Sequence, residues 1–187
     1  QENQDTINEE SVNIDADIIG IGGGEEGIEL LENEVKETSA DEEIVQMSQM
    51  EIDAKDIREN YNFILPLQGI ISSRFGPRTP TDIVSANHAG IDIAANSGTQ
   101  FIAAMEGNVT YVSSEGGYGN HVYIENGDVT TLYAHCKTIY VKEGEKITQG
   151  QLIGEVGSTA NATGPHLHFE VRKEDRVVNP EYILSFD

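Results

Sequence analysis

The chain has 187 residues, enough for one ordinary domain and an appendage, and 33 acidic against 11 basic residues give it a net charge of −22. Such an acidic chain has little with which to neutralise phosphates, which argues against nucleic acid and against an anionic membrane face as partners. Cys136 is the single cysteine, so no disulfide can form within the chain, and no run of about 18 apolar residues predicts a membrane-spanning helix.

The acidic residues gather at the N-terminal end. Residues 1–60 hold 19 of the 33 acidic residues but only 3 of the 11 basic ones. Residues 25–37 place apolar side chains at helical spacings, and residues 40–60 contain good helix formers with a looser apolar pattern. We interpret residues 1–60 as an acidic, partly helical linker or stalk. Because the sequence begins with Gln1, we also expect a trimmed product that has lost a signal peptide or anchor.

The pattern changes at Tyr61. Residues 61–187 consist of short runs rich in Val, Ile, Tyr and Thr that are interrupted by glycine, which predicts an all-β domain. Residues 120–124 alternate and are followed by Asn126-Gly127, a strong hairpin signal, with residues 129–135 as the returning strand. Further short strands are expected at residues 139–141, 146–148 and 152–154.

All five histidines lie in this second part: His88, His121, His135, His166 and His168. His166 and His168 share a face if their segment is a strand, because side chains alternate with a period of two. His88 and Asp92 are four apart, again an even spacing in extended chain. Two strands would then offer three or four metal-binding groups, which predicts a zinc site. A zinc site with an open position is typical of a hydrolase.

Not every polar residue of this region is expected to take part. His121 lies within a predicted strand and belongs to no motif, so we interpret it as structural. Cys136 follows His135 and is expected to point to the opposite face and to pack in the core. Tyr118 and Asn120 are candidates to line a substrate groove.

Several longer motifs follow one another between Pro66 and Tyr182. They are SRFGPR at 73–78, HAGIDI at 88–93, GYGN at 117–120, TLYAH at 131–135, GQLIG at 150–154, GPHLHFEVR at 164–172 and VNP at 178–180. On these motifs the chain resembles the M23 metallopeptidases, the lysostaphin- and LytM-like zinc endopeptidases of bacterial cell walls. Loop 79–87 departs from some members in having no aromatic residue.

The resemblance implies a fold and a set of roles. The fold would be an all-β catalytic domain of antiparallel sheets, of the duplicated hybrid or barrel-sandwich type, at residues 61–187. His88, Asp92 and His168 would ligate Zn2+, and His135 and His166 would be the catalytic pair beside the open position. One of this pair would take a proton, and the other would stabilise the oxyanion or protonate the leaving amine; the order stays open. Glu170 is either a carboxylate that orients a ligand or a surface residue.

The expected function is that of a zinc-dependent endopeptidase that hydrolyses peptide bonds in peptidoglycan stems or cross-bridges, on the outer side of the bacterial cell membrane. The alternative is a non-catalytic envelope protein that uses the same fold to bind or activate a partner. A lipoyl-type carrier would need a lysine at its hairpin tip, and residues 101–110 contain none. Residues 1–60 would hold the domain on a membrane anchor, contact an envelope partner, or fold over the groove as a latency device.

Overall fold

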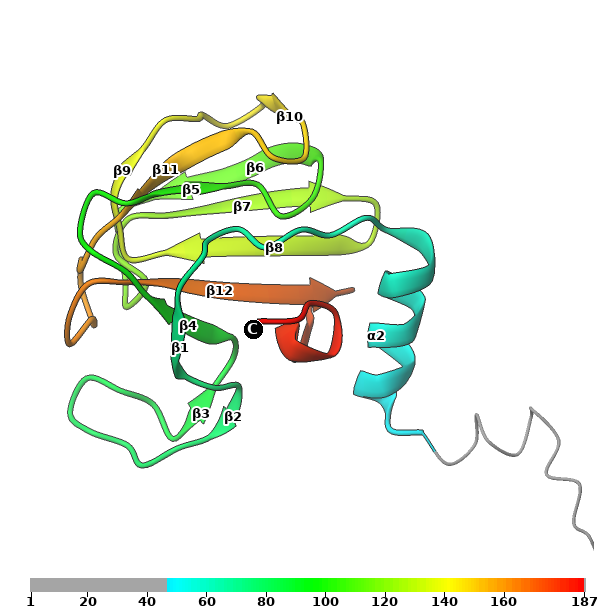
Figure 1. The fold of residues 1–187 in the computed structure, drawn as a ribbon, viewed down its shortest axis with the longest axis horizontal. Coiled ribbons are helices and arrows are strands. Elements are labelled where there is room, and N and C mark those ends of the chain that lie inside the picture. The colour runs from blue at the N-terminus through cyan, green and yellow to red at the C-terminus, as the bar shows by residue number, and fades with distance from the viewer. Residues whose placement is uncertain (1–46, 187) are drawn as a thin grey trace, which may run out of the picture. The chain divides into compact units, whose positions relative to one another are not determined.

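The structure, a computed structural model, describes residues 47–186 (Figure 1). The helix expected at residues 25–37 lies outside the described residues. Helix α2 (Gln49–Asn60) is followed by strands and a short 3-10 helix, η1 (Pro180–Tyr182). The strands are β1 (Ile70–Ser73), β2 (Gly76–Pro77), β3 (Asn87–His88), β4 (Ile91–Ala94), β5 (Gln100–Ile102), β6 (Gly107–Ser113), β7 (His121–Asn126), β8 (Val129–Ala134), β9 (Cys136–Ile139), β10 (Lys146–Ile147), β11 (Leu152–Val156), β12 (His166–Lys173) and β13 (Arg176–Val178).

These strands form antiparallel sheets, which confirms the predicted all-β fold. The large sheet has the order β1-β4-β12-β8-β7-β6-β10, with β13 paired to β12. A second sheet has the order β5-β11-β9, and β2 pairs with β3. Figure 1 shows the sheet of β5, β9 and β11 lying over strands β6 to β8.

The core lies between the two larger sheets. Phe101 of β5 stacks on Tyr133 of β8 with ring centroids 5.6 Å apart, and Tyr133 contacts Phe169 of β12 at 5.4 Å. All three side chains are fully buried. Burial of each large apolar side chain contributes about 1.5–3 kcal/mol, so this aromatic row joins the small sheet firmly to the large one.

The local predictions have mixed outcomes. The hairpin is confirmed, because β7 and β8 pair with Asn126 opposite Val129, and Gly127 adopts a φ of 61° in the turn. The strand expected at residues 139–141 is wrong, since the chain pairs as β9 over Cys136–Ile139 instead. The reason is a bend at His135, whose φ is also 61° and which passes the chain from the large sheet to the small one.

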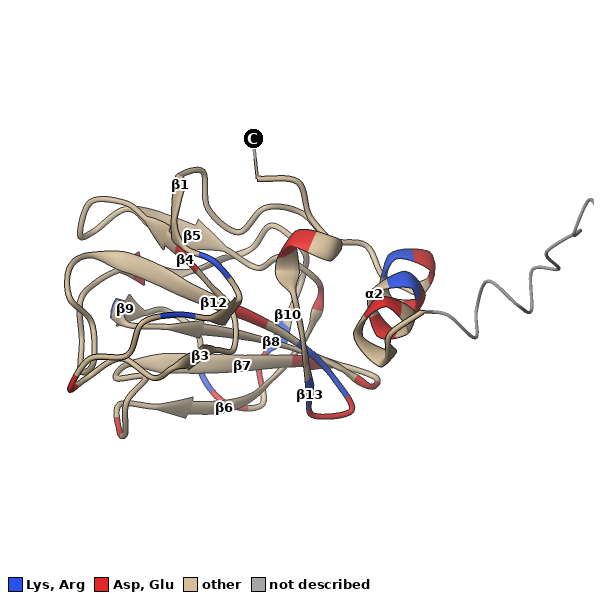
Figure 2. Ribbon diagram, turned by 90° about the horizontal axis from the view of Figure 1, so that it is seen from below, with Lys and Arg blue, Asp and Glu red and all other residues tan. Residues whose placement is uncertain are grey.

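Helix α2 is built into the described domain. Ser48 and Glu51 form a capping box at its start, and Ala54 and Ile57 are buried in the core. Asp53 accepts two hydrogen bonds from the guanidinium of Arg176, at 2.9 and 3.0 Å; Figure 2 shows the charged residues of α2 and of the β12–β13 turn. No helix among residues 47–186 has the length and apolar character needed to cross a membrane. The predicted boundary between residues 60 and 61 stays a prediction.

The pair of Asp53 and Arg176 gives a test of how α2 is held. Its hydrogen bonds lower the pKa of the Asp53 carboxyl below the ordinary value. We expect Asp53→Asn to lower the free energy of unfolding by about 1–2 kcal/mol at pH 7 in urea titrations. Because the pKa of Asp53 is lower in the folded state, its ionised form stabilises the fold at any pH above the unfolded pKa of about 3.9. This stabilisation is lost as the pH falls through the folded pKa.

The difference between Asp53→Asn and the wild type should therefore shrink in acid. Glu59→Gln, at an exposed carboxylate of the same helix, is the matched control and should change little. Equal stability of Asp53→Asn and wild type at pH 7 would contradict a structural role for the pair.

Candidate metal centre and its pocket

The centre of the site is set by the pairing of β4 with β12. Asp92 lies directly opposite His168 in this antiparallel register. Residues that face each other in this way place their side chains on the same side of the sheet. The Oδ1 atom of Asp92 accordingly lies 2.8 Å from Nδ1 of His168.

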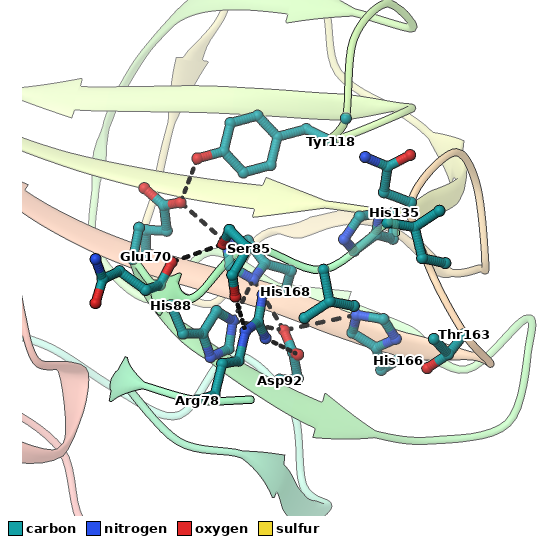
Figure 3. A pocket seen from close by; sticks show the side chains of 16 residues that line it. Arg78, Ser85, His88, Asp92, Tyr118, His135, Thr163, His166, His168 and Glu170 are labelled. Atoms are coloured by element: carbon teal, nitrogen blue, oxygen red, sulfur yellow. Dashed lines mark hydrogen bonds and ion pairs between the residues drawn. The ribbon is translucent and has the colours of Figure 1, made fainter. Parts of the chain in front are cut away.

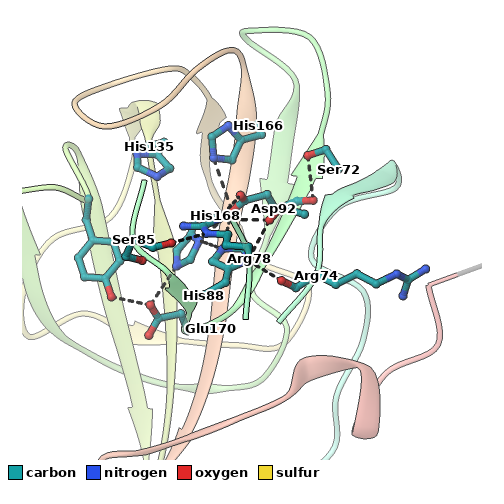
Figure 4. Close-up of polar contacts among 12 residues, drawn as sticks. Ser72, Arg74, Arg78, Ser85, His88, Asp92, His135, His166, His168 and Glu170 are labelled. Atoms are coloured by element: carbon teal, nitrogen blue, oxygen red, sulfur yellow. Dashed lines mark hydrogen bonds and ion pairs between the residues drawn. The ribbon is translucent and has the colours of Figure 1, made fainter. Parts of the chain in front are cut away.

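His88 reaches the same point from strand β3. The chain bends at Ala89 and Gly90 before β4 begins, so His88 and Asp92 do not lie on one extended strand. The prediction that they share a face because their spacing is even is therefore wrong. The bend nevertheless brings Nε2 of His88 to 3.0 Å from Asp92 Oδ1 and 3.0 Å from His168 Nδ1. The structure thus brings together the three predicted metal-binding residues (Figure 4).

Hydrogen bonds on the far side of each imidazole decide which nitrogen faces the centre. Nδ1 of His88 lies 2.8 Å from the Arg74 carbonyl oxygen, and Nε2 of His168 lies 2.9 Å from Glu170 Oε1. Each of these nitrogens donates to its oxygen, so the two that face Asp92 carry lone pairs.

This donor set fits a small divalent cation. The three facing atoms are 2.8–3.0 Å apart, and atoms rich in electrons repel at such distances unless positive charge lies among them. Ligand atoms 2.0–2.1 Å from a tetrahedral zinc ion are about 3.3 Å apart, close to the observed separations. Two imidazoles and one carboxylate are also a ligand type that zinc accepts.

Glu170 supports His168 from behind. Its side chain is fully buried and accepts hydrogen bonds from the Tyr118 hydroxyl at 2.5 Å and from Arg172 at 2.6 and 2.8 Å. Burial acts to raise its pKa, but the hydrogen bond with His168, aided by Tyr118 and Arg172, lowers it to about 2. Of the two interpretations of Glu170, the structure therefore excludes the surface residue and places the carboxylate where it orients His168.

His135 and His166 flank the three residues. Nε2 of His166 is 3.5 Å from Asp92 Oδ1, and the rings of His135 and His166 are 4.8 Å apart. Their Nδ1 atoms lie 2.9 and 2.8 Å from the carbonyl oxygens of Thr159 and Gly164, so both Nε2 atoms carry lone pairs. Burial, and then the nearby His166, lower the pKa of His135 to about 4, which keeps this imidazole neutral at pH 7.

The three predicted zinc ligands and the two flanking histidines line one pocket, of about 270 Å³ (Figure 3). They are His88, Asp92, His168, His135 and His166. Its walls also contain Tyr118, as predicted, and loop residues such as Ile83 and Val84. Asn120 is not among the lining residues, because its amide donates to the Cys136 carbonyl at 3.0 Å.

The two residues interpreted as structural lie away from the centre of the site. His121 is buried, and its Nδ1 atom lies 2.7 Å from the Gly119 carbonyl oxygen. Cys136 is fully buried, and burial raises the pKa of its thiol to about 12, so it packs as a small apolar residue.

One residue of the pocket was missed from the sequence. Arg78 donates from Nη1 to Ser73 Oγ at 3.2 Å and approaches Asp92 Oδ2 at 3.5 Å, and it donates from Nε to the Ser85 carbonyl at 3.1 Å. The only signal for it was its place at the end of the SRFGPR motif. No local spacing rule relates that position to Asp92, because a long loop separates them.

The comparisons agree with this fold. The family model described as Peptidase family M23 matches residues 86–180, and the chain belongs to this family. A protein of Neisseria meningitidis serogroup B named DD-carboxypeptidase/endopeptidase Mpg is 46% identical over 112 residues, which cover 59% of this chain and 26% of that protein. The chain thus spans about a quarter of the length of such a relative.

Two further matches bear on function. Murein hydrolase activator NlpD of Escherichia coli is 36% identical over 117 residues, covering 62% of this chain and 29% of that protein. The crystal structure of a zinc containing peptidase from Vibrio cholerae aligns with a TM-score of 0.59 at 31% identity, covering 67% of this chain and 40% of that one.

The bend between β3 and β4 gives a test of the geometry. A Cβ atom on Gly90 would lie 2.2 Å from the backbone oxygen of Phe169, which cannot move without disturbing β12. We expect Gly90→Ala to lower the free energy of unfolding by about 1–3 kcal/mol in urea titrations. Gly164→Ala is the matched control, since nothing lies within 4 Å of its added Cβ. Equal stability of the two variants would contradict the close packing of the bend on β12.

Proposed function

We propose that this chain is a zinc-dependent endopeptidase that hydrolyses peptide bonds in peptidoglycan stems or cross-bridges. In this proposal His88, Asp92 and His168 hold the zinc ion, and His135 and His166 are the catalytic residues. The observation that carries it is the triangle of facing atoms 2.8–3.0 Å apart beside two further imidazoles in the same pocket. Membership of family M23 and the similarity to Mpg and to the Vibrio cholerae zinc peptidase support it.

The chemistry divides between the ion and the chain. A bound zinc ion supplies Lewis acidity, which polarises the scissile carbonyl and acidifies a water molecule. The chain supplies two imidazoles whose Nε2 atoms are free to accept a proton, because both Nδ1 atoms donate to backbone carbonyls. One imidazole takes the proton of the attacking water at Nε2. The other protonates the leaving amine or stabilises the oxyanion once its own Nε2 atom has taken up a proton.

The backbone hydrogen bonds also restrict how these imidazoles turn. Thr159 and Gly164, which accept from His135 and His166, belong to the chain segment between β11 and β12. That segment therefore fixes both rings at once. A fixed ring reaches the transition state with less loss of conformational entropy than a mobile one.

The two groups of residues should respond differently to substitution. We expect His168→Ala and Asp92→Ala to lose zinc and activity together, as measured by metal analysis and by digestion of purified peptidoglycan. His135→Ala and His166→Ala should keep one zinc per chain while turnover falls by about 10²–10⁴-fold. Loss of zinc from His166→Ala, with zinc retained by His168→Ala, would reverse the assigned roles of the two histidines of β12.

The buried carboxylate behind His168 gives a separate expectation. Glu170→Gln keeps the size of the side chain but removes the charge that faces His168 Nε2. We expect zinc affinity to fall by about 10–100-fold in competition titrations with a chelating dye. Glu106→Gln, at an exposed carboxylate, is the control. Unchanged affinity in Glu170→Gln would show that this carboxylate serves folding alone.

A substrate in the cell wall places the protein on the outer side of the membrane, in the bacterial cell envelope. In this proposal residues 1–60 form the acidic linker that connects the domain to a membrane anchor or an envelope partner. Within this segment, helix α2 at residues 49–60 packs on β13 and so joins the linker to the domain.

The similarity to NlpD favours one second candidate, a domain that binds or activates another wall hydrolase without cleaving the wall itself. Digestion of purified peptidoglycan by the zinc-loaded chain, with products identified by mass spectrometry, separates the two. Peptide cleavage by the wild type but not by His135→Ala supports the endopeptidase. Absence of cleavage together with stimulation of an added wall hydrolase supports the activator.

A further inference from the structure

One basic side chain of the pocket has no part in the chemistry proposed above. Arg78 follows strand β2, and its guanidinium lies in front of the metal-binding residues (Figures 3 and 4). The side chain is 24% exposed, so it is accessible from the pocket.

The hydrogen bonds of Arg78 leave part of the guanidinium available. A guanidinium carries five N–H groups in a planar fork. Nε donates to Ser85, and Nη1 donates to Ser73 and approaches Asp92. Among residues 47–186, none accepts a hydrogen bond from Nη2. Two N–H groups of a side chain that is otherwise fixed are therefore available to a ligand.

The charges around the pocket make Arg78 distinctive. Of the described lining residues, it is the only lysine or arginine. Both carboxylates of the lining have other roles: Asp92 is a proposed zinc ligand, and Glu170 accepts hydrogen bonds from His168, Tyr118 and Arg172. Charges farther away than about 8 Å are largely screened at physiological ionic strength, so the acidity of the chain as a whole does not cancel this local cation.

An apolar surface lies beside the guanidinium. Ile83 and Val84 line the pocket from the loop that follows Arg78, and Ile83 is 45% exposed. The loop is closed on itself by hydrogen bonds from Arg78 N to Ala86 O at 2.8 Å and from Thr81 N to Val84 O at 3.0 Å. A cation and an aliphatic surface thus lie on one loop, which suits a small residue that carries a carboxylate.

We propose that Nη2 of Arg78 binds a carboxylate of the peptide substrate, while Ile83 and Val84 contact the aliphatic part of the same residue. This inference rests on the proposed function and defines its substrate class. Nη1 of Arg78 is 3.5 Å from Asp92 Oδ2, and consecutive Cα atoms are about 3.8 Å apart. The carboxylate therefore belongs to the residue that adjoins the scissile bond or to the next one. Both a C-terminal carboxylate and an acidic side chain offer this group.

The test uses two matched pairs of short peptides with the zinc-loaded chain. One pair ends in a free carboxylate or its amide, and the other has Glu or Gln beside the scissile bond. The enzymes are wild type, Arg78→Gln, Arg78→Lys and the control Arg58→Gln, at an exposed arginine of helix α2 outside the pocket. The readouts are kcat and KM for each peptide, zinc content, and dissociation constants measured by calorimetry with His135→Ala.

In one of the two pairs we expect kcat/KM of the wild type to be about 10–100-fold higher for the acid peptide than for its neutral partner, mostly because KM is lower. Arg78→Gln should reduce this ratio to near one with zinc retained, Arg78→Lys should keep part of it, and Arg58→Gln should match wild type. The pair that shows the preference identifies the source of the carboxylate.

Other results would overturn the proposal. Equal use of acid and neutral peptides by wild type would do so while leaving the proposed peptidase activity intact. An equal loss on both members of each pair, with loss of zinc, would make Arg78 a residue that only positions Asp92. If wild type cleaved neither these peptides nor purified peptidoglycan, the proposed function would fail. The ratio of the dissociation constants measured by calorimetry for the acid and the neutral peptide would then decide whether Arg78 binds a carboxylate. Tighter binding of the acid peptide supports the carboxylate site, and equal binding of the two refutes it.

Discussion

The register between β4 and β12 is the constraint on which the site depends. Ile91 and Ile93 alternate with Asp92, and Leu167 and Phe169 flank His168; all four apolar side chains are fully buried. A slip of one residue would turn them out of the core and the polar residues into it, at a cost of about 1.5–3 kcal/mol for each side chain. The apolar face of this strand pair therefore holds Asp92 opposite His168. Without a cation between them, the carboxylate oxygen and the nitrogen lone pair repel each other at this distance.

Further contacts support this arrangement from behind. Glu170 lies two residues after His168 on the same face, and Arg172 and Tyr118 satisfy the rest of its carboxylate. His135 adopts a φ of 61°, which costs a residue with a side chain about 1–3 kcal/mol. That conformation ends β8 at the pocket and sends the next residues into the small sheet. The stability of the two packed sheets offsets the cost of placing polar and strained residues in one cavity.

Much of this could be predicted from the sequence, and the remainder shows where local rules end. The period of two correctly placed His166 and His168 on one face, and the Asn126-Gly127 signal correctly gave the β7–β8 hairpin. The same period gave the wrong reason for His88 and Asp92, because the chain bends at Gly90. Partners such as Arg78 for Asp92 depend on contacts between distant segments, which no spacing rule encodes. The zinc ligands and catalytic roles assigned to these residues stay predictions.

The most direct test of the central idea is a crystal structure of the zinc-loaded chain with anomalous diffraction data collected on both sides of the zinc absorption edge. The account predicts one strong peak that disappears below the edge and lies in contact with His88 Nε2, Asp92 Oδ1 and His168 Nδ1. An ordered site without such a peak, or a zinc ion bound only elsewhere on the chain, would contradict it.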